Sequence, residues 1–284
     1  MLTIGDFHEQ VLSGHYASPA DHLPARPQRQ GVRSWWRFYA GLARTVAKGL
    51  RTVRSGTFSL KLFSELAYDM VRVVEKTGAN VTFEGFDALV PCRGKPFVVV
   101  ANHMSLIETM LLPAGVFAAN DMTVVAKRSL TRYPGFGKVL ASCHPILLDR
   151  KNARKDLADT LEQGTALLKG GTSILLFPQG HRAAVFDPRR FNSLGAKLAA
   201  RAGAPLVPVA CKTDFARPGW PLRDFGPVDP RRAVKFACGP VLDPALPQRD
   251  LQEACIAHIS AKLAEWGMGV ATEHQEEKSN VEGN

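Results

Sequence analysis

The sequence predicts an α/β domain with a largely parallel central sheet flanked by helices and an amphipathic helical extension on its N-terminal side. From residue 81 onwards, short apolar runs of strand length alternate with helical patterns. This alternation is typical of parallel strands joined by crossover helices. Between residues 33 and 78 the periodicity is helical throughout. We therefore expect helices before a single layered domain at 79–267.

Composition permits one large domain with extensions and indicates an anionic partner. The 284 residues are 45% hydrophobic and carry a formal net charge of +10. Net charge alone does not distinguish nucleic acid, lipid headgroups and acidic carrier proteins. The five cysteines show no C-x-x-C spacing, so the sequence favours neither a zinc site nor a disulfide framework.

The first 32 residues are polar and irregular, and "PADHLPARPQRQG" is rich in proline. We expect residues 1–32 to form a mobile polar arm that does not pack. The start "MLTIGDFHEQ" lacks the basic and apolar runs of an export signal. The protein is therefore expected to stay in the cytosol.

Residues 33–78 are predicted to form two helices. On the first, apolar side chains share one broad arc: Trp35, Phe38, Tyr39, Leu42, Val46, Leu50 and Val53. Basic side chains lie opposite or beside that arc: Arg33, Arg37, Arg44, Lys48 and Arg51. Such a helix suits an anionic membrane surface, and it equally suits packing on the domain. The second pattern, "FSLKLFSELAYDMVRVVEKTG", ends at a glycine cap, Gly78.

Seven strands are predicted in the domain. They are "VTFEGF" from Val81, "PFVVVA" from Pro96, "MTVVAK" from Met122, "PILLDR" from Pro145, "TSILLF" from Thr172, "PLVPVAC" from Pro205 and "AVKFACG" from Ala233. Helices are expected at 152–169, 191–202 and 250–266. The acidic tail at 268–284 is expected to be disordered.

The stretch "VVVANHMSLIETMLL" places a histidine and a carboxylate together inside apolar sequence. If the valines form a strand, His103 lies at its carboxyl end, where open α/β sheets place their ligand sites. Glu108 in the first helical turn can then face His103 and stabilise it as a general base. The alternative is a capping box in which Glu108 reaches back to the Ser105 amide.

Basic residues follow two other predicted strands. "PILLDR" ends in Arg150, and "ILLFPQGHR" brings Gly180 and Arg182 to the end of another strand. Arginine beside glycine at the carboxyl ends of parallel strands suits bidentate capture of a phosphate. Each arginine taken alone can equally be a solvated loop charge.

In order along the chain, these stretches resemble the blocks of the glycerolipid acyltransferase family, which includes the 1-acylglycerol-3-phosphate acyltransferases. The blocks are "NHMSLIE", of the form H-x4-D/E, then "ILLDR", "FPQGHR" and "VPVA". The segment "KRSLTRYPGFG" also resembles the lysine, proline and glycine segment between the first two blocks. The resemblance runs from about Val81 to Cys211.

The resemblance implies that His103 acts as the general base and that Glu108 orients it. It also implies that Arg150, Arg182 and the Gly180 backbone hold the acceptor's anionic headgroup, assisted by Lys127. No metal or bound cofactor is implied, because an acyl-coenzyme A or acyl carrier protein thioester supplies the acyl group.

Two departures from the family pattern bear on the site. Glu108 replaces the usual Asp. In the third block, Gln179 replaces Glu and His181 replaces Thr. We expect Gln179 to be among the residues that bind the acceptor, and the loss of a carboxylate there to affect the choice of acceptor.

The implied partners are an anionic membrane surface, a lysolipid acceptor and, as one candidate donor, acyl carrier protein. The protein is then expected to bind the cytoplasmic face of the membrane peripherally. A lyso-aminolipid acceptor of the ornithine-lipid type and a catalytically silent lipid-binding protein of the same fold are the alternatives. Nucleic acid is not expected as a partner, because no helix-turn-helix, aromatic strand pair or zinc finger is evident.

Overall fold

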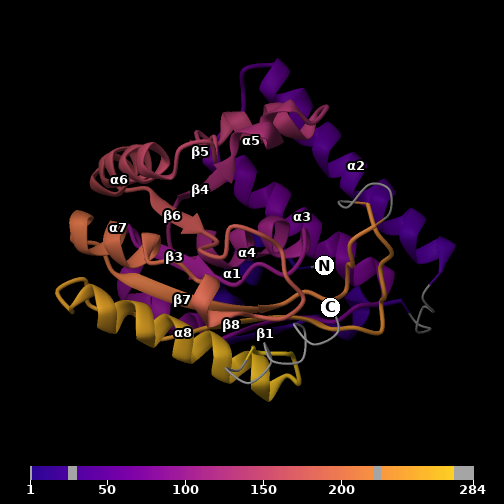
Figure 1. Cartoon of the computed structure of the whole chain (residues 1–284). Helices are drawn as coiled ribbons and strands as arrows, with labels where there is room; N and C mark the ends of the chain where they lie inside the picture. The colour runs from indigo at the N-terminus through magenta and orange to yellow at the C-terminus, as the bar shows by residue number, and fades with distance from the viewer. Residues whose placement is uncertain (1, 25–30, 220–224, 272–284) are drawn as a thin grey trace, which may run out of the picture.

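The computed structural model describes residues 2–24, 31–219 and 225–271. Within these residues, eight strands form one sheet in the order β1-β2-β8-β7-β3-β6-β4-β5 (Figure 1). The strands are β1 (His15–Ala17), β2 (Val81–Glu84), β3 (Val98–Ala101), β4 (Met122–Lys127), β5 (Ile146–Leu148), β6 (Ser173–Leu176), β7 (Leu206–Lys212) and β8 (Val234–Cys238). The β1–β2 and β7–β8 pairs are antiparallel, and the other pairs are parallel. The predicted largely parallel sheet and its seven strands are confirmed.

Eight α-helices accompany the sheet in the described part of the chain. They are α1 (Ile4–Leu12), α2 (Val32–Arg54), α3 (Leu60–Thr77), α4 (Ile107–Phe117), α5 (Phe136–Ser142), α6 (Ala153–Lys169), α7 (Leu194–Ala202) and α8 (Gln248–Glu265). Local chemistry sets several of their ends. Helix α3 ends at Gly78, whose φ of 102° suits glycine, as the sequence predicts. The Asn152 side chain caps α6 by accepting the Lys155 N–H.

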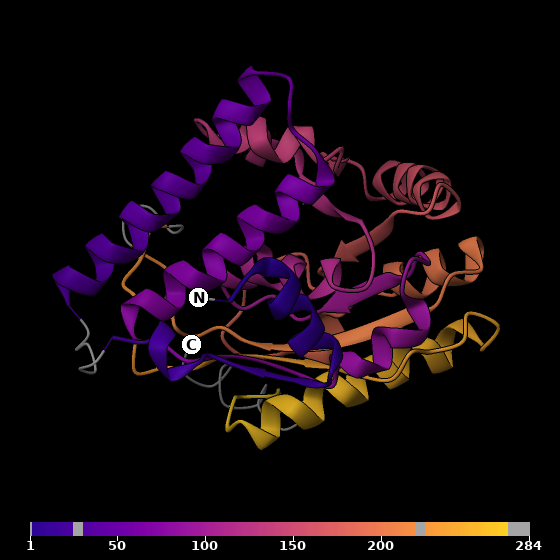
Figure 2. The same cartoon turned by 180° about the vertical axis from the view of Figure 1, so that it is seen from behind.

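The apolar strands are buried on both faces, so alternate residues belong to two separate cores. On β3, Val99 and Ala101 pack in one core with side chains from α1, α3 and α4. Val98 and Val100 pack in the other core with side chains from α6, α7 and α8. Helix α8 lies along β7 on one face, and the back view shows α2 and α3 side by side (Figures 1 and 2). Burial on both faces leaves the strand ends as the place for polar chemistry.

The prediction that residues 1–32 form an unpacked arm is wrong for residues 3–24. Thr3 begins α1 with a capping box, and Phe7 and Val11, one helical turn apart, are fully buried. Tyr16 on β1 is also fully buried and pairs with Phe83 on β2. The apolar spacing of this short helix outweighs its polar composition, because it completes the core beneath α3. Residues 25–30, within the proline-rich part, lie outside the described residues.

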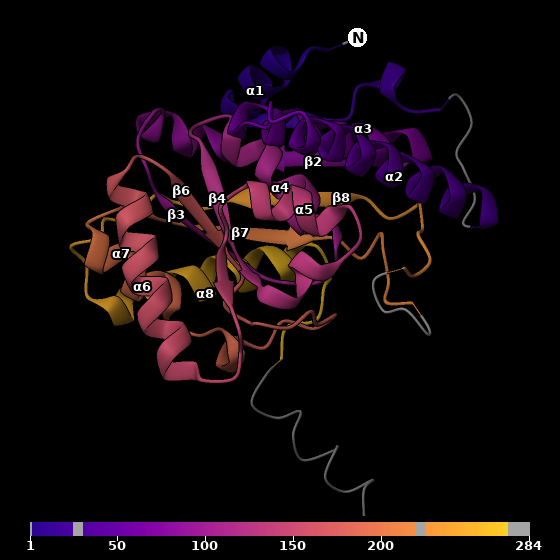
Figure 3. The ribbon, with the colours of Figure 1, turned by 90° about the horizontal axis from the view of Figure 1, so that it is seen from above.

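Helix α2 packs on the domain through small residues. A Cβ atom at Gly41 would lie 2.6 Å from the Val73 side chain on α3, so glycine permits this close approach. Phe38 is buried, whereas the predicted basic residues on α2 are exposed apart from Lys48, which pairs with Asp69 at 2.7 Å. Viewed from above, α2 lies at the opposite side of the molecule from α6 and α7 (Figure 3). Packing on the domain, one of the two interpretations left open by the sequence, is therefore observed.

Two further sequence expectations concern the membrane and the tail. Among the described helices, none is both long enough and apolar enough to cross a bilayer. Residues 268–271 return to the domain, where Val270 forms a bridge with Phe186. The rest of the predicted disordered tail, 272–284, lies outside the described residues.

Candidate active site

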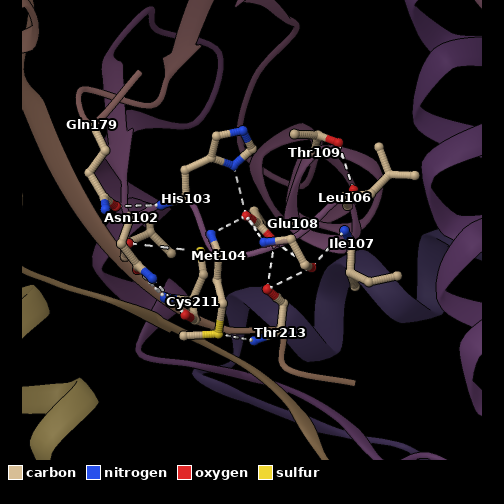
Figure 4. A network of polar contacts seen from close by, with 12 residues as sticks. Asn102, His103, Met104, Leu106, Ile107, Glu108, Thr109, Gln179, Cys211 and Thr213 are labelled. Atoms are coloured by element: carbon tan, nitrogen blue, oxygen red, sulfur yellow. Dashed lines mark hydrogen bonds and ion pairs between the residues drawn. The ribbon is translucent and has the colours of Figure 1, made fainter. Parts of the chain in front are cut away.

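The site begins where β3 ends beside β7. The Asn102 side chain extends the pairing of these strands: its Oδ1 accepts the Cys211 N–H at 2.7 Å, and its Nδ2 donates to the Cys211 carbonyl at 2.8 Å. This double contact holds the turn that follows β3 against the end of β7 (Figure 4). His103 therefore leaves the sheet at the carboxyl edge predicted from the sequence.

His103 and Glu108 are in direct contact. The His103 Nδ1 lies 2.8 Å from the Glu108 Oε1, and the Glu108 side chain is fully buried. The same oxygen accepts the backbone N–H groups of Met104 at 2.5 Å and Ser105 at 2.7 Å. The histidine–carboxylate pair and the capping contact, which the sequence leaves as alternatives, are both present.

The surroundings of Glu108 favour its charged form. Burial raises the pKa of this carboxyl group, but the hydrogen bond and charge of His103 and a hydrogen bond from Thr213 outweigh burial and bring the pKa below its ordinary value. A carboxylate that is charged and accepts from Nδ1 fixes the histidine tautomer and leaves Nε2 as the basic nitrogen. This arrangement suits a general base.

The remaining side of His103 faces a cavity. Its ring stacks on Phe177 with ring centroids 4.5 Å apart, and its second nitrogen points away from Glu108 (Figure 4). The cavity has a volume of about 930 Å³, and His103 is part of its wall. A substrate in this cavity can therefore reach Nε2.

The loop after β6 makes hydrogen bonds with both backbone groups of His103, its N–H and its carbonyl. The Gln179 Oε1 accepts the His103 N–H at 2.7 Å, and the Ala183 N–H donates to the His103 carbonyl at 2.9 Å. Gln179 is predicted to contact the acceptor, but its side-chain oxygen is directed at His103, and it is not among the residues that line the cavity. A glutamine oxygen and a glutamate oxygen can both accept this hydrogen bond.

The other predicted binding residues meet at the cavity. The residues at the ends of three different strands, or in the loops after them, line the same space as His103: Lys127, Arg150, Gly180 and Arg182. Gly180 has a φ of 70°, which favours glycine at this turn. The cavity thus combines a basic nitrogen with cationic groups.

Arg150 has an unusual backbone conformation with a visible support. Its φ is 58°, in the left-handed region that non-glycine residues seldom adopt. The Asp156 carboxylate accepts the Asp149 N–H at 3.2 Å and the Arg150 N–H at 2.7 Å. This double acceptor fixes the turn that brings Arg150 to the cavity.

Sequence reasoning did not find two parts of the site. The first is the apolar wall supplied by α2, which includes Leu42, Val46 and Leu50. These residues belong to the predicted apolar arc, but the arc does not reveal that it faces a cavity. The second is Thr213, whose hydroxyl lies 2.5 Å from the Glu108 Oε2 although the two residues are far apart in sequence. Among the described residues, no three His, Cys, Asp or Glu side chains are grouped as metal ligands would be.

A model of the acyltransferase family matches residues 80–212. This part of the chain is therefore similar to that family. The acyltransferase segment runs from just before β2 to the end of β7 and contains the predicted site residues.

The acyltransferase segment has named relatives. The chain is 36% identical over 128 residues to a 1-acyl-sn-glycerol-3-phosphate acyltransferase from Pseudomonas aeruginosa, covering 44% of this chain and 49% of the relative. It is 32% identical over 127 residues to a probable enzyme of the same name from Mycoplasma genitalium, covering 44% and 46%. The matches thus span about half the length of these curated relatives.

A solved structure shares the fold. The crystal structure of the 1-acyl-sn-glycerophosphate (LPA) acyltransferase PlsC from Thermotoga maritima superposes with a TM-score of 0.61 at 19% sequence identity. The superposition covers 82% of this chain and 96% of the PlsC chain. The similarity therefore extends beyond the segment that the family model matches.

Proposed function

We propose that the protein transfers a fatty acyl group from a thioester donor to the hydroxyl of a lysophospholipid-type acceptor such as 1-acylglycerol-3-phosphate. The observation that carries the proposal is the His103–Glu108 contact at the wall of a large cavity that arginines also line. The names of the relatives support this choice of acceptor.

In the proposed reaction, the His103 Nε2 removes the proton from the acceptor hydroxyl. The hydroxyl oxygen then attacks the thioester carbonyl carbon, and the carbon–sulfur bond breaks as the new ester forms. The departing thiolate takes this proton from the His103 imidazolium and leaves as a thiol. Glu108 stabilises the transient imidazolium through Nδ1. The loss of the proton to the leaving group regenerates the base, and no covalent acyl-enzyme is formed.

The walls of the cavity divide naturally between the two ends of an amphiphilic substrate. Arg150 and Arg182 line the cavity and are the residues that we propose bind the anionic headgroup, together with the Gly180 backbone and Lys127. The apolar wall from α2 and α3, with Val46 and Phe63 among its residues, suits an acyl chain. The headgroup and the adjoining part of the acyl chain would then both lie near His103.

The proposed partner surface is an anionic membrane. At the N-terminal end of α2, Val32 is 74% exposed and Trp36 is 60% exposed. Arginines on the same helix, including Arg33 and Arg37, are exposed beside them. Exposed tryptophan next to arginine suits the interface of an anionic leaflet, from which amphiphilic substrates can reach the cavity.

The test is an acyl-transfer assay with purified protein. Acyl-coenzyme A and acyl carrier protein thioesters are offered in turn, with lysophosphatidate and a lyso-aminolipid as acceptors and the His103→Ala variant as the blank. Product with lysophosphatidate that requires His103 is the expected result. Product only with the lyso-aminolipid moves the proposal to that acceptor, and no transfer with any pair leaves a silent lipid-binding protein.

A further inference from the structure

We propose that Thr213 is a positioning residue of the active site: its hydroxyl holds the second oxygen of the Glu108 carboxylate, which keeps the first oxygen on the His103 ring. This inference rests on the proposed function. Thr213 directly follows the segment 80–212 matched by the family model. It comes from the end of β7, opposite the turn that carries His103 (Figure 4).

The available protons assign a direction to the hydrogen bonds around the Glu108 Oε2. The Thr213 Oγ1 lies 2.5 Å from Oε2, and the Ser105 Oγ lies 3.0 Å from Oε2 and 2.9 Å from the Thr213 Oγ1. A carboxylate only accepts, so Thr213 donates its single hydroxyl proton to Oε2. The Ser105 proton goes to Thr213 or to Oε2, while the Ser105 Oγ itself accepts the Ile107 N–H at 3.0 Å. Thr213 is therefore the nearest donor to this oxygen.

The two Glu108 oxygens are held by different kinds of partner. Oε1 accepts from the His103 ring and from two backbone N–H groups, which the turn fixes. Oε2 accepts from hydroxyl groups, which can rotate. The terminal torsion of a glutamate is broad, so both oxygens must be held to fix the carboxylate plane. The Thr213 hydroxyl supplies this constraint from outside the turn.

Thr213 is itself anchored relative to the turn. Cys211, two residues before Thr213, makes two hydrogen bonds with Asn102, and the Thr213 N–H lies 3.4 Å from the Met104 sulfur. The Thr213 and Glu108 side chains are both fully buried. Because no solvent reaches this contact, water cannot simply replace a missing hydroxyl there.

Electrostatics agrees with the geometry. The Thr213 hydrogen bond is one of the contacts that lower the pKa of Glu108 against the effect of burial. The other titratable groups facing Glu108 are His103 and the Cys211 thiol, whose pKa is raised by burial and by the Glu108 charge, so it stays neutral. Removal of the Thr213 hydroxyl therefore makes the His103–Glu108 pair bind a proton more readily.

The principal test compares Thr213→Val, which keeps the branched shape without the hydroxyl, with Thr213→Ser, which keeps the hydroxyl. Thr213→Val should lower kcat by about ten- to a hundredfold, because a hydrogen bond to a charged group is lost. The KM for donor and acceptor should change by less than about twofold, since Thr213 touches neither substrate. The acid limb of the kcat/KM profile should move to higher pH. Thr213→Ser should restore the rate and the profile.

Four further results test the role of Thr213. Wild-type kcat and an unmoved pH profile in Thr213→Val overturn the proposal, as do equal losses in Val and Ser variants, which indicate packing alone. In a cycle with Glu108→Gln, the double variant should be no slower than Glu108→Gln; multiplied losses overturn the proposal. If Thr213→Val does not fold, Thr213→Cys replaces the hydroxyl by a weaker donor. A wild-type rate in Thr213→Cys then also overturns the proposal.

A readout without turnover separates this inference from the proposed function. The proton on the His103 Nδ1 should give a downfield NMR signal, assigned by its loss in His103→Ala. The signal should persist in Thr213→Ser and move upfield or broaden in Thr213→Val. An unchanged signal in Thr213→Val overturns the role of Thr213 even if the protein proves to transfer no acyl group. If the wild-type protein shows the expected signals but transfers no acyl group, the proposed function is wrong and the role of Thr213 is retained.

Discussion

Two fully buried glutamates, Glu108 and Glu75, have similar partners in different regions of the molecule. Each lies close to a histidine Nδ1, at 2.8 Å for Glu108 and 3.1 Å for Glu75. Each is also bonded to hydroxyl groups, which for Glu75 are those of Tyr16 at 2.5 Å and Ser18 at 2.8 Å. The same chemistry is thus used once beneath the N-terminal segment and once at the cavity.

The difference lies in the far side of each histidine. The His22 side chain is 1% exposed, and its Nε2 is buried without a hydrogen-bond partner among the described residues. The Glu75 carboxylate is also paired with Arg72, so its charge is already balanced. His103, at 15% exposure, lines a cavity instead. A histidine–carboxylate pair becomes available for catalysis when its second ring nitrogen is accessible. The buried His22–Glu75 pair, here called the sealed pair, instead holds residues 15–22 against α3.

The largest expected effect separates the two histidines by activity. His103→Ala should lower kcat by about 10²- to 10⁴-fold, because a positioned general base is lost. His22→Ala should leave kcat within about twofold while lowering the melting temperature, because it removes a buried contact to Glu75. Steady-state kinetics and thermal unfolding of both variants provide the comparison. Equal activity losses in the two variants contradict the division into an open and a sealed pair.

The second effect concerns the sealed carboxylate. Glu75→Ala should lower the free energy of unfolding by about 3–5 kcal/mol, because Arg72 and the Tyr16 hydroxyl lose their buried acceptor. Urea unfolding followed by circular dichroism measures this change. Glu75→Gln is the matched control, since it keeps an acceptor and should cost less. Wild-type stability in Glu75→Ala shows that the N-terminal segment is fastened by its apolar contacts alone.

The third effect concerns the arginines of the two regions. Arg72 pairs with the Glu75 carboxylate, whereas Arg150 and Arg182 line the cavity. Arg150→Ala or Arg182→Ala should raise the acceptor KM by about ten- to a hundredfold and the donor KM far less, because a charge-assisted contact to the headgroup is lost. Arg72→Ala should reduce stability without changing either KM. Equal changes in both KM values for the cavity variants move these arginines to the donor or to a structural role.

The comparison also shows what a sequence can reveal. His103 and Glu108 are five residues apart and follow a strand, so periodicity and strand-end logic indicate their contact, with a capping box as the alternative. His22 and Glu75 are 53 residues apart in sequence, and nothing local in either region indicates their pairing. Strand β1 escaped prediction because its three residues, His15–Ala17, lie in polar sequence, whereas the equally short β5 lies in an apolar run. Local patterns therefore predicted the seven apolar strands and the turn that carries His103, and missed contacts that only the assembled sheet creates.

The place of the basic residues at the cavity was predictable for the same reason and to the same limit. Lys127, Arg150 and Arg182 follow predicted strands, whose carboxyl ends converge in a parallel sheet. The orientation of the Gln179 side chain depends instead on the loop that crosses over His103. Side-chain direction in a loop has no periodic signal, so the sequence suggested an acceptor contact where the structure has a backbone contact.

The smallest expected effect is that of Gln179→Glu. It bears on the contrast between the two histidine–glutamate pairs, because only His103 lies at a cavity on a turn that a neighbouring loop supports. Glutamate can still accept the His103 N–H, so the turn should persist and activity should remain on every acceptor. Its added negative charge is three residues from Arg182 in the sequence, which should disfavour acceptors with a phosphate relative to a lyso-aminolipid by about three- to tenfold. Relative rates on a panel of acceptors with one thioester donor measure this shift.

Gln179→Ala is the matched control for that prediction, because it removes the acceptor of the His103 N–H without adding charge. This change should lower the rate on all acceptors alike, since it loosens the turn that carries the base rather than the headgroup contacts. A selective shift in the Glu variant with a uniform loss in the Ala variant assigns Gln179 two separable effects, one on the backbone and one on the local charge. A uniform gain on all acceptors in the Glu variant instead marks glutamine as a weakened form of the family's glutamate. Unchanged rates and profile in the Glu variant make the replacement neutral, and the choice of acceptor must then depend on the arginines and the shape of the cavity.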